Sequence, residues 1–218
     1  MVKAVFFDLD GTLCDTLPDL TASLNYALRT FDLPVYNSDQ VRGMIGNGVS
    51  RLCALALPPD RQELHPQILA LFRAHYAAHC TDLTRPYPGV SDAVLALSER
   101  GILLGVLSNK PQVMSESVIS GCFEKNLFKD VLGQTERLPL KPDPALFTET
   151  MQRHGLLSSE TLYVGDSDTD LMFAKNAGVT AIGCAWGYRG KEFLLAHGAR
   201  YVIDRPMDLL GFVFSQEG

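Results

Sequence analysis

At 218 residues the chain is long enough for a core domain with a modest insert, and its hydrophobic content of 46% is typical of globular proteins. The formal net charge of -6 comes from dispersed acidic residues without a basic stripe, so we do not expect nucleic acid as a partner. The 5 cysteines are far apart and include no C-x-x-C pair, which suits reduced thiols. The chain opens on a predicted strand and has no apolar run of about 18 residues, so we expect a cytoplasmic protein that does not contact a membrane.

The first predicted strand, residues 2–7, leads directly into two acids. Its β-branched and aromatic residues favour a strand that is buried on both faces. Asp8 and Asp10 follow it, and residues two apart on an extended chain share a face. Their carboxylates are therefore expected to converge beyond the carboxyl end of the strand, where open α/β sheets bind ligands. The alternative is a solvated Asp-Gly turn.

Residues 17–83 are predicted to form a helical insert. Apolar residues recur at three- and four-residue steps from Leu17 to Phe31, as on one face of a helix. Gly46-Asn47-Gly48 interrupts the next helical pattern, and Pro58-Pro59 ends it. A further amphipathic helix is expected over residues 60–80, and no strand is expected in this stretch.

After a turn-rich linker at residues 85–89, predicted helices and strands alternate to the end of the chain. The strands expected there are residues 102–107, 128–132, 161–164, 180–184 and 201–203. The helices between them are expected near residues 91–100, 111–123, 144–154 and 168–177. With the first strand this gives about six strands alternating with helices, which predicts an α/β fold with a doubly wound parallel sheet.

Polar side chains follow three of the predicted strands: Asp8 and Asp10, then Ser108 and Asn109, then Asp166 and Asp170. The carboxyl ends of parallel strands lie along one edge of a sheet, so these residues can meet at one site, joined by Lys141 from a nearby loop. Several carboxylates at close range raise one another's pKa unless a counter-charge is present. Oxygen ligands of this kind suit Mg²⁺, which commonly bridges to a phosphate.

Four motifs, in chain order, resemble those of the haloacid dehalogenase superfamily. They are D-x-D-G-T at residues 8–12, Ser108-Asn109 after a predicted strand, Lys141 in K-P-D-P, and G-D-S-x-x-D at residues 165–170. By this resemblance, residues 1–16 and 84–218 form a Rossmann-like catalytic core. Residues 17–83 would be a helical cap inserted after the first strand.

The resemblance also implies roles for the matching residues. Asp8 would be the nucleophile that forms an aspartyl-phosphate, and Asp10 would be the general acid and base. The Asp8 carboxylate, the Asp10 main-chain oxygen and Asp166 would hold Mg²⁺. The residues that would bind or support the phosphoryl group are Ser108, Asn109 and Lys141, with Asp170 orienting Lys141 or the waters of the metal. An acid at position 10 indicates phosphoryl chemistry, because a halide leaves without a proton.

Softer signals concern the substrate. Residues 15–20 and 45–48 are similar to the phosphoglycolate phosphatase group, so the best candidate is 2-phosphoglycolate. Gly48-Val49-Ser50-Arg51 is also similar to a cap segment of β-phosphoglucomutases, but the usual His of that group after the first motif is missing. The alternatives are therefore a phosphotransferase of that kind and a phosphate-binding protein without activity.

Selectivity is expected to lie in the cap, because the core motifs address only the phosphoryl group and the metal. Asn47 and Arg51 stand at a predicted helix start, where a substrate carboxylate is favoured. Trp186, Tyr188 and Arg189 follow a predicted strand and could stack on a ligand, but loop packing is the preferred interpretation. The expected partner is a small phosphorylated metabolite, and the expected state is a monomer or homodimer.

Overall fold

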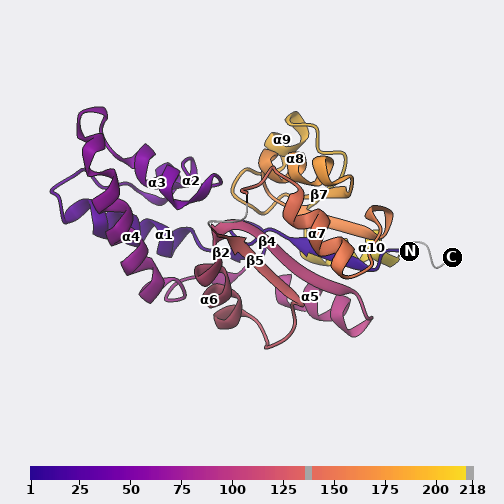
Figure 1. Ribbon diagram of the computed structural model, residues 1–218. Helices are drawn as coiled ribbons and strands as arrows, with labels where there is room; N and C mark the ends of the chain where they lie inside the picture. The colour runs from indigo at the N-terminus through magenta and orange to yellow at the C-terminus, as the bar shows by residue number, and fades with distance from the viewer. Residues whose placement is uncertain (136–138, 215–218) are drawn as a thin grey trace.

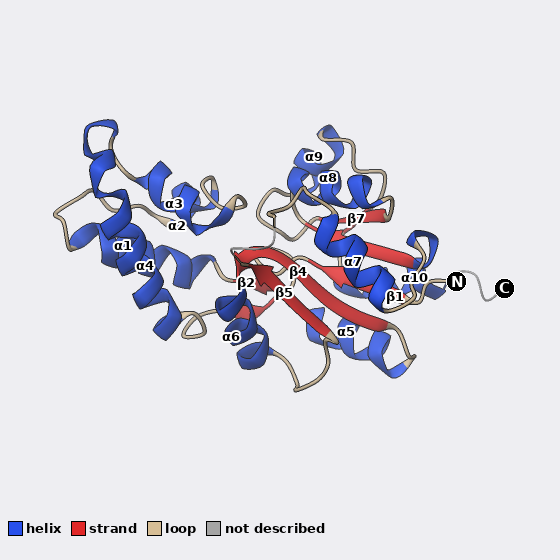
Figure 2. Cartoon of the chain, in the orientation of Figure 1, coloured by secondary structure: helices blue, strands red, loops and turns tan. Residues whose placement is uncertain are grey.

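A computed structural model of the chain describes residues 1–135 and 139–214. Figure 1 shows two groups of elements: helices α1 to α4 on one side, and a sheet with its covering helices on the other. Figure 2 shows that all the long strands belong to the second group. The predicted α/β class is confirmed.

The main sheet has six strands in the order β5-β4-β1-β6-β7-β8, and every neighbouring pair in it is parallel. Ala4 of β1 lies opposite Leu103 on one side and Thr161 on the other, so β1 is central. All four residues of β1 are buried, as the apolar run predicts. The six strands are β1 Ala4–Phe7, β4 Leu103–Pro111, β5 Asp130–Gln134, β6 Thr161–Gly165, β7 Thr180–Cys184 and β8 Val202–Ile203.

Alternate residues of β1 face two helical layers. Val5 and Phe7 join one buried cluster, with side chains from α5, α6 and α10. Ala4 and Phe6 join a second cluster, with side chains from α7 and α8. This is the two-residue period of a strand covered on both faces. The helices after β3 are α5 Val90–Glu99, α6 Gln112–Cys122, α7 Ala145–Arg153, α8 Asp168–Ala177, α9 Lys191–Ala196 and α10 Leu209–Phe214, with 3₁₀ turns Ser158–Glu160 and Pro206–Asp208.

Residues 17–83, here called the helical segment, contain no strand, as predicted. The single helix expected over residues 60–80 is instead a 3₁₀ turn followed by α4, because Arg61 leaves the helical backbone region. The division into a core of residues 1–16 and 84–218 and a cap of 17–83 stays a prediction, and its core includes residues 136–138 and 215–218, outside the described part. The elements of the segment are α1 Leu17–Arg29, α2 Ser38–Arg42, α3 Gly48–Ala56, 3₁₀ turn Pro59–Leu64 and α4 His65–His79.

The two ends of the helical segment are tied together at its junction with the sheet. Strands β2 Cys14–Asp15 and β3 Arg85–Pro86 pair antiparallel. The buried Asp19 carboxylate accepts hydrogen bonds from the backbone N–H groups of Leu83 and Thr84 at 2.8–3.0 Å and from the Thr84 hydroxyl at 2.8 Å. Entry and exit of the segment therefore lie side by side.

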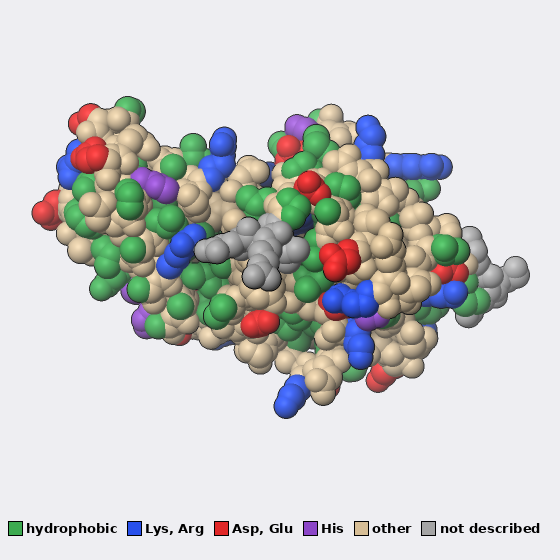
Figure 3. Space-filling view, viewed as in Figure 1, with side chains coloured by type: hydrophobic (Ala, Val, Ile, Leu, Met, Phe, Trp, Pro, Cys, Tyr) green, Lys and Arg blue, Asp and Glu red, His purple; other side chains and the backbone are tan. Residues whose placement is uncertain are grey.

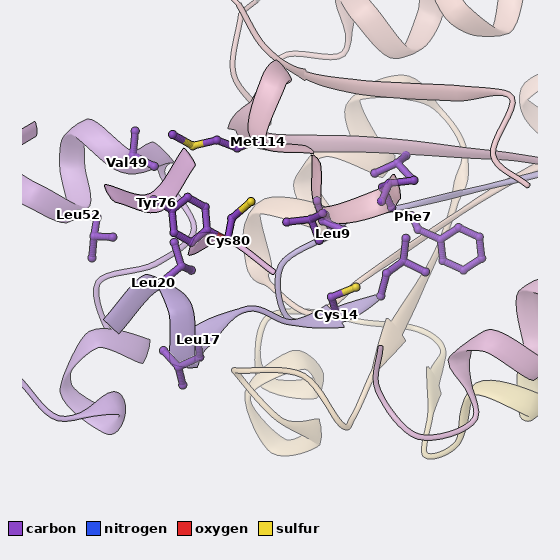
Figure 4. Close-up of a cluster of buried hydrophobic side chains, with 14 of the residues drawn as sticks. Phe7, Leu9, Cys14, Leu17, Leu20, Val49, Leu52, Tyr76, Cys80 and Met114 are labelled. Atoms are coloured by element: carbon purple, nitrogen blue, oxygen red, sulfur yellow. The ribbon is translucent and has the colours of Figure 1, made fainter. Parts of the chain in front are cut away.

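One buried cluster extends from the helical segment into the sheet. Figure 4 shows Tyr76, Cys80 and Leu20 close together, with Leu9 and Cys14 farther toward the core. On the face drawn in Figure 3, acidic and basic side chains are interspersed, in keeping with the dispersed charge of the sequence. Among the described residues, no helix has the length and apolar character needed to cross a membrane.

Candidate active site

Asp8 and Asp10 stand where β1 ends and the chain turns sharply. The Asp8 N–H donates to Val164 O at 2.9 Å, which extends the pairing of β1 with β6 by one residue. Gly11 has φ of +84°, and a Cβ at this position would collide with the Asp166 carboxylate. A glycine is required here for both reasons, its left-handed backbone and the close approach of the acid.

The carboxyls of Asp8, Asp166 and Asp170 form a buried acidic cluster, with one oxygen of each lying within 4.8 Å of the others. Burial raises the pKa of Asp8 to about 6; Lys141 opposes this rise, and the neighbouring carboxyls of Asp170 and Asp10 add to it. Burial also raises the pKa of Asp166, with further repulsion from Asp170 and Asp8. The carboxyls therefore compete for the positive charge available to them.

Lys141 provides the cation nearest to this cluster. Its Nζ lies 2.7 Å from Asp170 Oδ1 and 2.9 Å from Asp8 Oδ1, and it donates to the Tyr163 hydroxyl at 3.0 Å. Burial alone would lower the pKa of Lys141, but the Asp170 and Asp8 carboxylates raise it above its ordinary value. The predicted pairing of Asp170 with Lys141 is present. One lysine faces three carboxyls, so the cluster could hold a metal ion.

The donor set fits a hard divalent cation. All the groups of the cluster are carboxylates, the ligands that such a cation prefers. Although Lys141 is close, the buried Asp8 Oδ1 accepts no well-aligned hydrogen bond from the described residues. This oxygen keeps a lone pair free to face a metal or a reacting phosphorus atom.

Ser108 and Asn109 lie on the part of β4 that extends beyond the predicted strand. Ser108 lines the cavity described below. The Asn109 side chain accepts from the Lys141 N–H at 2.7 Å and donates to Lys141 O at 3.3 Å and Gly46 O at 3.2 Å. It therefore braces the Lys141 loop against the helical segment. Binding of phosphate by its amide would require one of these bonds to break.

Asp10 belongs to a second charged group, separate from the acidic cluster. Its Oδ1 accepts from the Thr16 hydroxyl at 2.7 Å and from Lys110 Nζ at 2.8 Å. Lys110 Nζ also donates to the Tyr76 hydroxyl at 2.7 Å. The Asp10 carboxylate is thus bound by Thr16 and Lys110 and is not part of the acidic cluster, which agrees with a metal contact through its main-chain oxygen.

Tyr188 packs on the buried cluster, as the loop-packing interpretation expects, but Tyr188 and Arg189 also line the cavity described below. The Tyr188 N–H donates to Asp166 Oδ2 at 2.7 Å, and the Tyr188 hydroxyl lies 3.0 Å from the Thr16 hydroxyl. Arg189 Nη2 donates to Ile45 O at 3.0 Å. Trp186 does pack in its loop, where its indole N–H donates to Thr12 O at 3.0 Å.

A cavity of about 50 Å³ lies between the sheet edge and the helical segment. Its wall includes every predicted core-site residue except Asp170. Four of its lining side chains are cationic, and two of these, Lys110 and Lys141, are paired with acids of the site. Asn47 and Arg51 are exposed and do not line it, whereas Gly46 and Gly48 do. The remaining cations on its wall are Arg42 and Arg189.

Some of these residues had a sequence signal and others had none. Lys110 directly follows Ser108-Asn109, so its closeness to the motif could have identified it. Arg42 reaches the cavity wall, and Tyr76 reaches Lys110, only through the packing of the helical segment on the sheet, and neither motif nor spacing marks them. Arg189 lies in the loop after β7.

Comparison with known proteins agrees with the motifs. The family of haloacid dehalogenase-like hydrolases matches residues 5–184. A phosphoglycolate phosphatase of Mannheimia succiniciproducens is 36% identical, over 97% of this chain and 98% of its own. One of Rhodospirillum rubrum is 37% identical, over 94% and 88%. A solved structure of a predicted phosphoglycolate phosphatase from Haemophilus somnus superimposes with a TM-score of 0.89 at 30% identity, covering 97% of each chain.

Proposed function

Because the chain belongs to the haloacid dehalogenase-like hydrolases and is a phosphatase, we propose that its substrate is a short phosphate monoester carrying a carboxylate, with 2-phosphoglycolate as the best candidate. The relatives quoted above are named for hydrolysis of this compound, which favours a hydrolase over the β-phosphoglucomutase-like alternative. The observation that carries the proposal is Arg189, a cationic side chain on the wall of a small cavity.

The proposed chemistry begins with the Asp8 carboxylate attacking phosphorus while Asp10 gives a proton to the leaving alkoxide oxygen. Asp10 then takes a proton from the water that attacks the aspartyl-phosphate on Asp8. Ser108, the backbone around Asn109 and the Lys141 ammonium would hold the phosphoryl oxygens. Mg²⁺ held by Asp8, Asp166 and the Asp10 main-chain oxygen would neutralise charge on the phosphoryl group.

The substrate carboxylate would be bound by Arg189. Lys110 and Lys141 have carboxylate partners within the site, and Arg42 forms an exposed ion pair with Asp39 at 3.3 Å. Among the described residues, the Arg189 guanidinium has Ile45 O as its hydrogen-bond acceptor and no ion-pair partner. Several of its N–H groups are therefore available to donate to a carboxylate, in the forked geometry that suits one.

Phosphate release from 2-phosphoglycolate and from ethyl phosphate, each with excess Mg²⁺, tests this assignment. We expect the wild type to prefer 2-phosphoglycolate, and Arg189→Gln to lower kcat/KM for it by roughly 10- to 100-fold with little change for ethyl phosphate, the scale of one charged hydrogen-bonded contact.

Arg51→Gln is the matched comparison, since it removes the same charge from the helix named by the sequence but not from the cavity wall. It should change neither rate by more than about two-fold. If Arg51→Gln lowers kcat/KM for 2-phosphoglycolate selectively and Arg189→Gln does not, the carboxylate is bound by Arg51 instead. Equal kcat/KM values of the wild type for 2-phosphoglycolate and ethyl phosphate would contradict the proposed substrate class.

A further inference from the structure

Lys110 is a buried ammonium on the sheet edge that none of the roles above uses. Its side chain is 1% exposed and lies 2.8 Å from Asp10 Oδ1. Its Nζ is also 3.2 Å from Asp10 Oδ2, so it holds both oxygens of one carboxylate. A buried charge in this position requires such pairing, because an unpaired ammonium would carry a large desolvation cost.

The same ammonium is bound by the helical segment. Tyr76 of α4 accepts a hydrogen bond from Lys110 Nζ at 2.7 Å, and the Nζ lies 4.5 Å from the centroid of the Tyr76 ring. Tyr76 is fully buried and stacks on Phe72, with ring centroids 5.5 Å apart. Burial raises the pKa of Tyr76, so its hydroxyl stays neutral. The buried Tyr76 ring, drawn in Figure 4, is therefore a fixed neutral support for the lysine.

We propose that Lys110 and Tyr76 are positioning residues for Asp10: Tyr76 holds the Lys110 ammonium, and Lys110 holds the Asp10 carboxylate in the orientation needed for proton transfer. Tyr76 belongs to the helical segment, whereas Asp10 and Lys110 belong to the sheet edge. The hydrogen bond from Lys110 to Tyr76 can form only when the segment packs on the sheet. Proton transfer is thereby coupled to packing of the segment.

The chemistry explains why a cation is useful at this place. When Asp10 gives its proton to the leaving oxygen, its carboxyl becomes a carboxylate beside Lys110, and that attraction offsets the new charge until water returns the proton. The Thr16 hydroxyl at 2.7 Å fixes the same oxygen from the other side. A carboxyl that is already held in the reactive orientation also does not lose conformational entropy in each catalytic cycle.

Tyr76→Phe tests the proposal, because it removes only the hydroxyl. The rates to measure are those for 4-nitrophenyl phosphate, whose leaving group needs no proton, and benzyl phosphate, whose leaving group does. We compare kcat/KM, which covers the departure of the leaving group but not the later hydrolysis that both esters share. We expect kcat/KM for benzyl phosphate to fall about ten-fold, and kcat/KM for the nitrophenyl ester to change less than about two-fold. Lys110→Met should show the same split with a larger loss, about 100-fold.

Tyr36→Phe is the matched control. This substitution also removes a part-buried tyrosine hydroxyl from the helical segment. The Tyr36 hydroxyl donates to Ala56 O at 2.9 Å and has no hydrogen bond with Lys110. The Tyr36→Phe variant should show no difference between the two esters. Equal losses on both esters in Tyr76→Phe, or no loss on either, would overturn the proposal.

The inference rests on the acid–base role proposed for Asp10 and not on the proposed substrate, since neither ester carries a carboxylate. Asp10→Asn, measured with the same pair of esters, separates the two failures. If Asp10→Asn lowers kcat/KM equally for both esters, the acid role of Asp10 is wrong and the positioning role falls with it. If Asp10→Asn shows the split and Tyr76→Phe does not, only the positioning role is overturned.

Discussion

The Asp8 carboxyl is held in conditions that oppose its own ionisation. Burial, and then repulsion from Asp170 and Asp10, outweigh the attraction of Lys141 and raise its pKa from 3.8 to about 6. The roles proposed for Asp8, as nucleophile and metal ligand, require its ionised form, which the protein alone does not favour below about pH 6. A bound divalent cation would favour the ionised form directly.

This conflict predicts a pH dependence of stability. Between about pH 4 and pH 6 the unfolded chain loses the Asp8 proton while the folded chain keeps it, so the free energy of unfolding should fall as pH rises, by roughly 3 kcal/mol in total. Urea unfolding in chelator at a series of pH values measures the decline. Excess Mg²⁺ should reduce it.

Asp8→Asn is the control for that measurement, because an amide does not titrate. Its free energy of unfolding should lack the part of the decline that is due to Asp8, and Mg²⁺ should stabilise it less than the wild type. Identical pH profiles for the wild type and Asp8→Asn would show that the raised pKa of Asp8 has no effect on stability.

The junction between sheet and helical segment depends on one helical carboxylate. Asp19 lies in the first turn of α1, is 2% exposed, and accepts hydrogen bonds from the backbone of Leu83 and Thr84 and from the Thr84 hydroxyl. Asp19→Ala would leave buried N–H groups without an acceptor. We expect a loss of about 2–4 kcal/mol in the free energy of unfolding, measured by urea titration.

Asp39→Ala provides the comparison within the same segment. The Asp39 side chain is 83% exposed and pairs with Arg42 at 3.3 Å, so its loss should cost less than about 0.5 kcal/mol. A similar cost for both substitutions would mean that the Asp19 hydrogen bonds do not secure the junction.

Helices and strands were predicted best from the sequence where consecutive residues of an element are all buried. The apolar run of β1 and the alternation of strands and helices after residue 89 are confirmed, because buried parallel strands require such runs. The pairing of Cys14–Asp15 with Arg85–Pro86 was not predicted, since two-residue strands have no periodicity. The four motifs predicted the core of the site because parallel strand ends converge by topology.

The cap residues were harder to predict because they depend on how two parts of the molecule meet. Arg51 and Arg189 differ little as sequence signals, yet only Arg189 lines the cavity. Which residue of a helix or loop faces a cavity is decided by the packing of the helical segment on the sheet, through contacts such as Tyr76 with Lys110. No local pattern records that packing.

Across the cavity, the helical segment and the sheet are joined through the loop before α3. Arg189 Nη2 donates to Ile45 O at 3.0 Å, and Asn109 Nδ2 donates to Gly46 O at 3.2 Å. Both donors come from the sheet edge, and both acceptors are backbone carbonyls of the helical segment. At the junction itself, the paired β2 and β3 hold together the two points where the chain enters and leaves the helical segment. Opening of the cavity would therefore break the Ile45 and Gly46 contacts while the junction stays paired.

Hydrogen exchange of the whole protein checks this arrangement. Arg189→Gln shortens the side chain and removes the bond to Ile45 O, so the backbone amides of residues 44–49 should exchange about five- to ten-fold faster than in the wild type, because local opening costs less free energy. The amides of β1 should not change. Arg205→Gln is a suitable comparison, since Arg205 is exposed and pairs with Asp208 outside the cavity. If residues 44–49 exchange at the same rate in all three proteins, the contact between Arg189 and Ile45 does not hold the helical segment over the site.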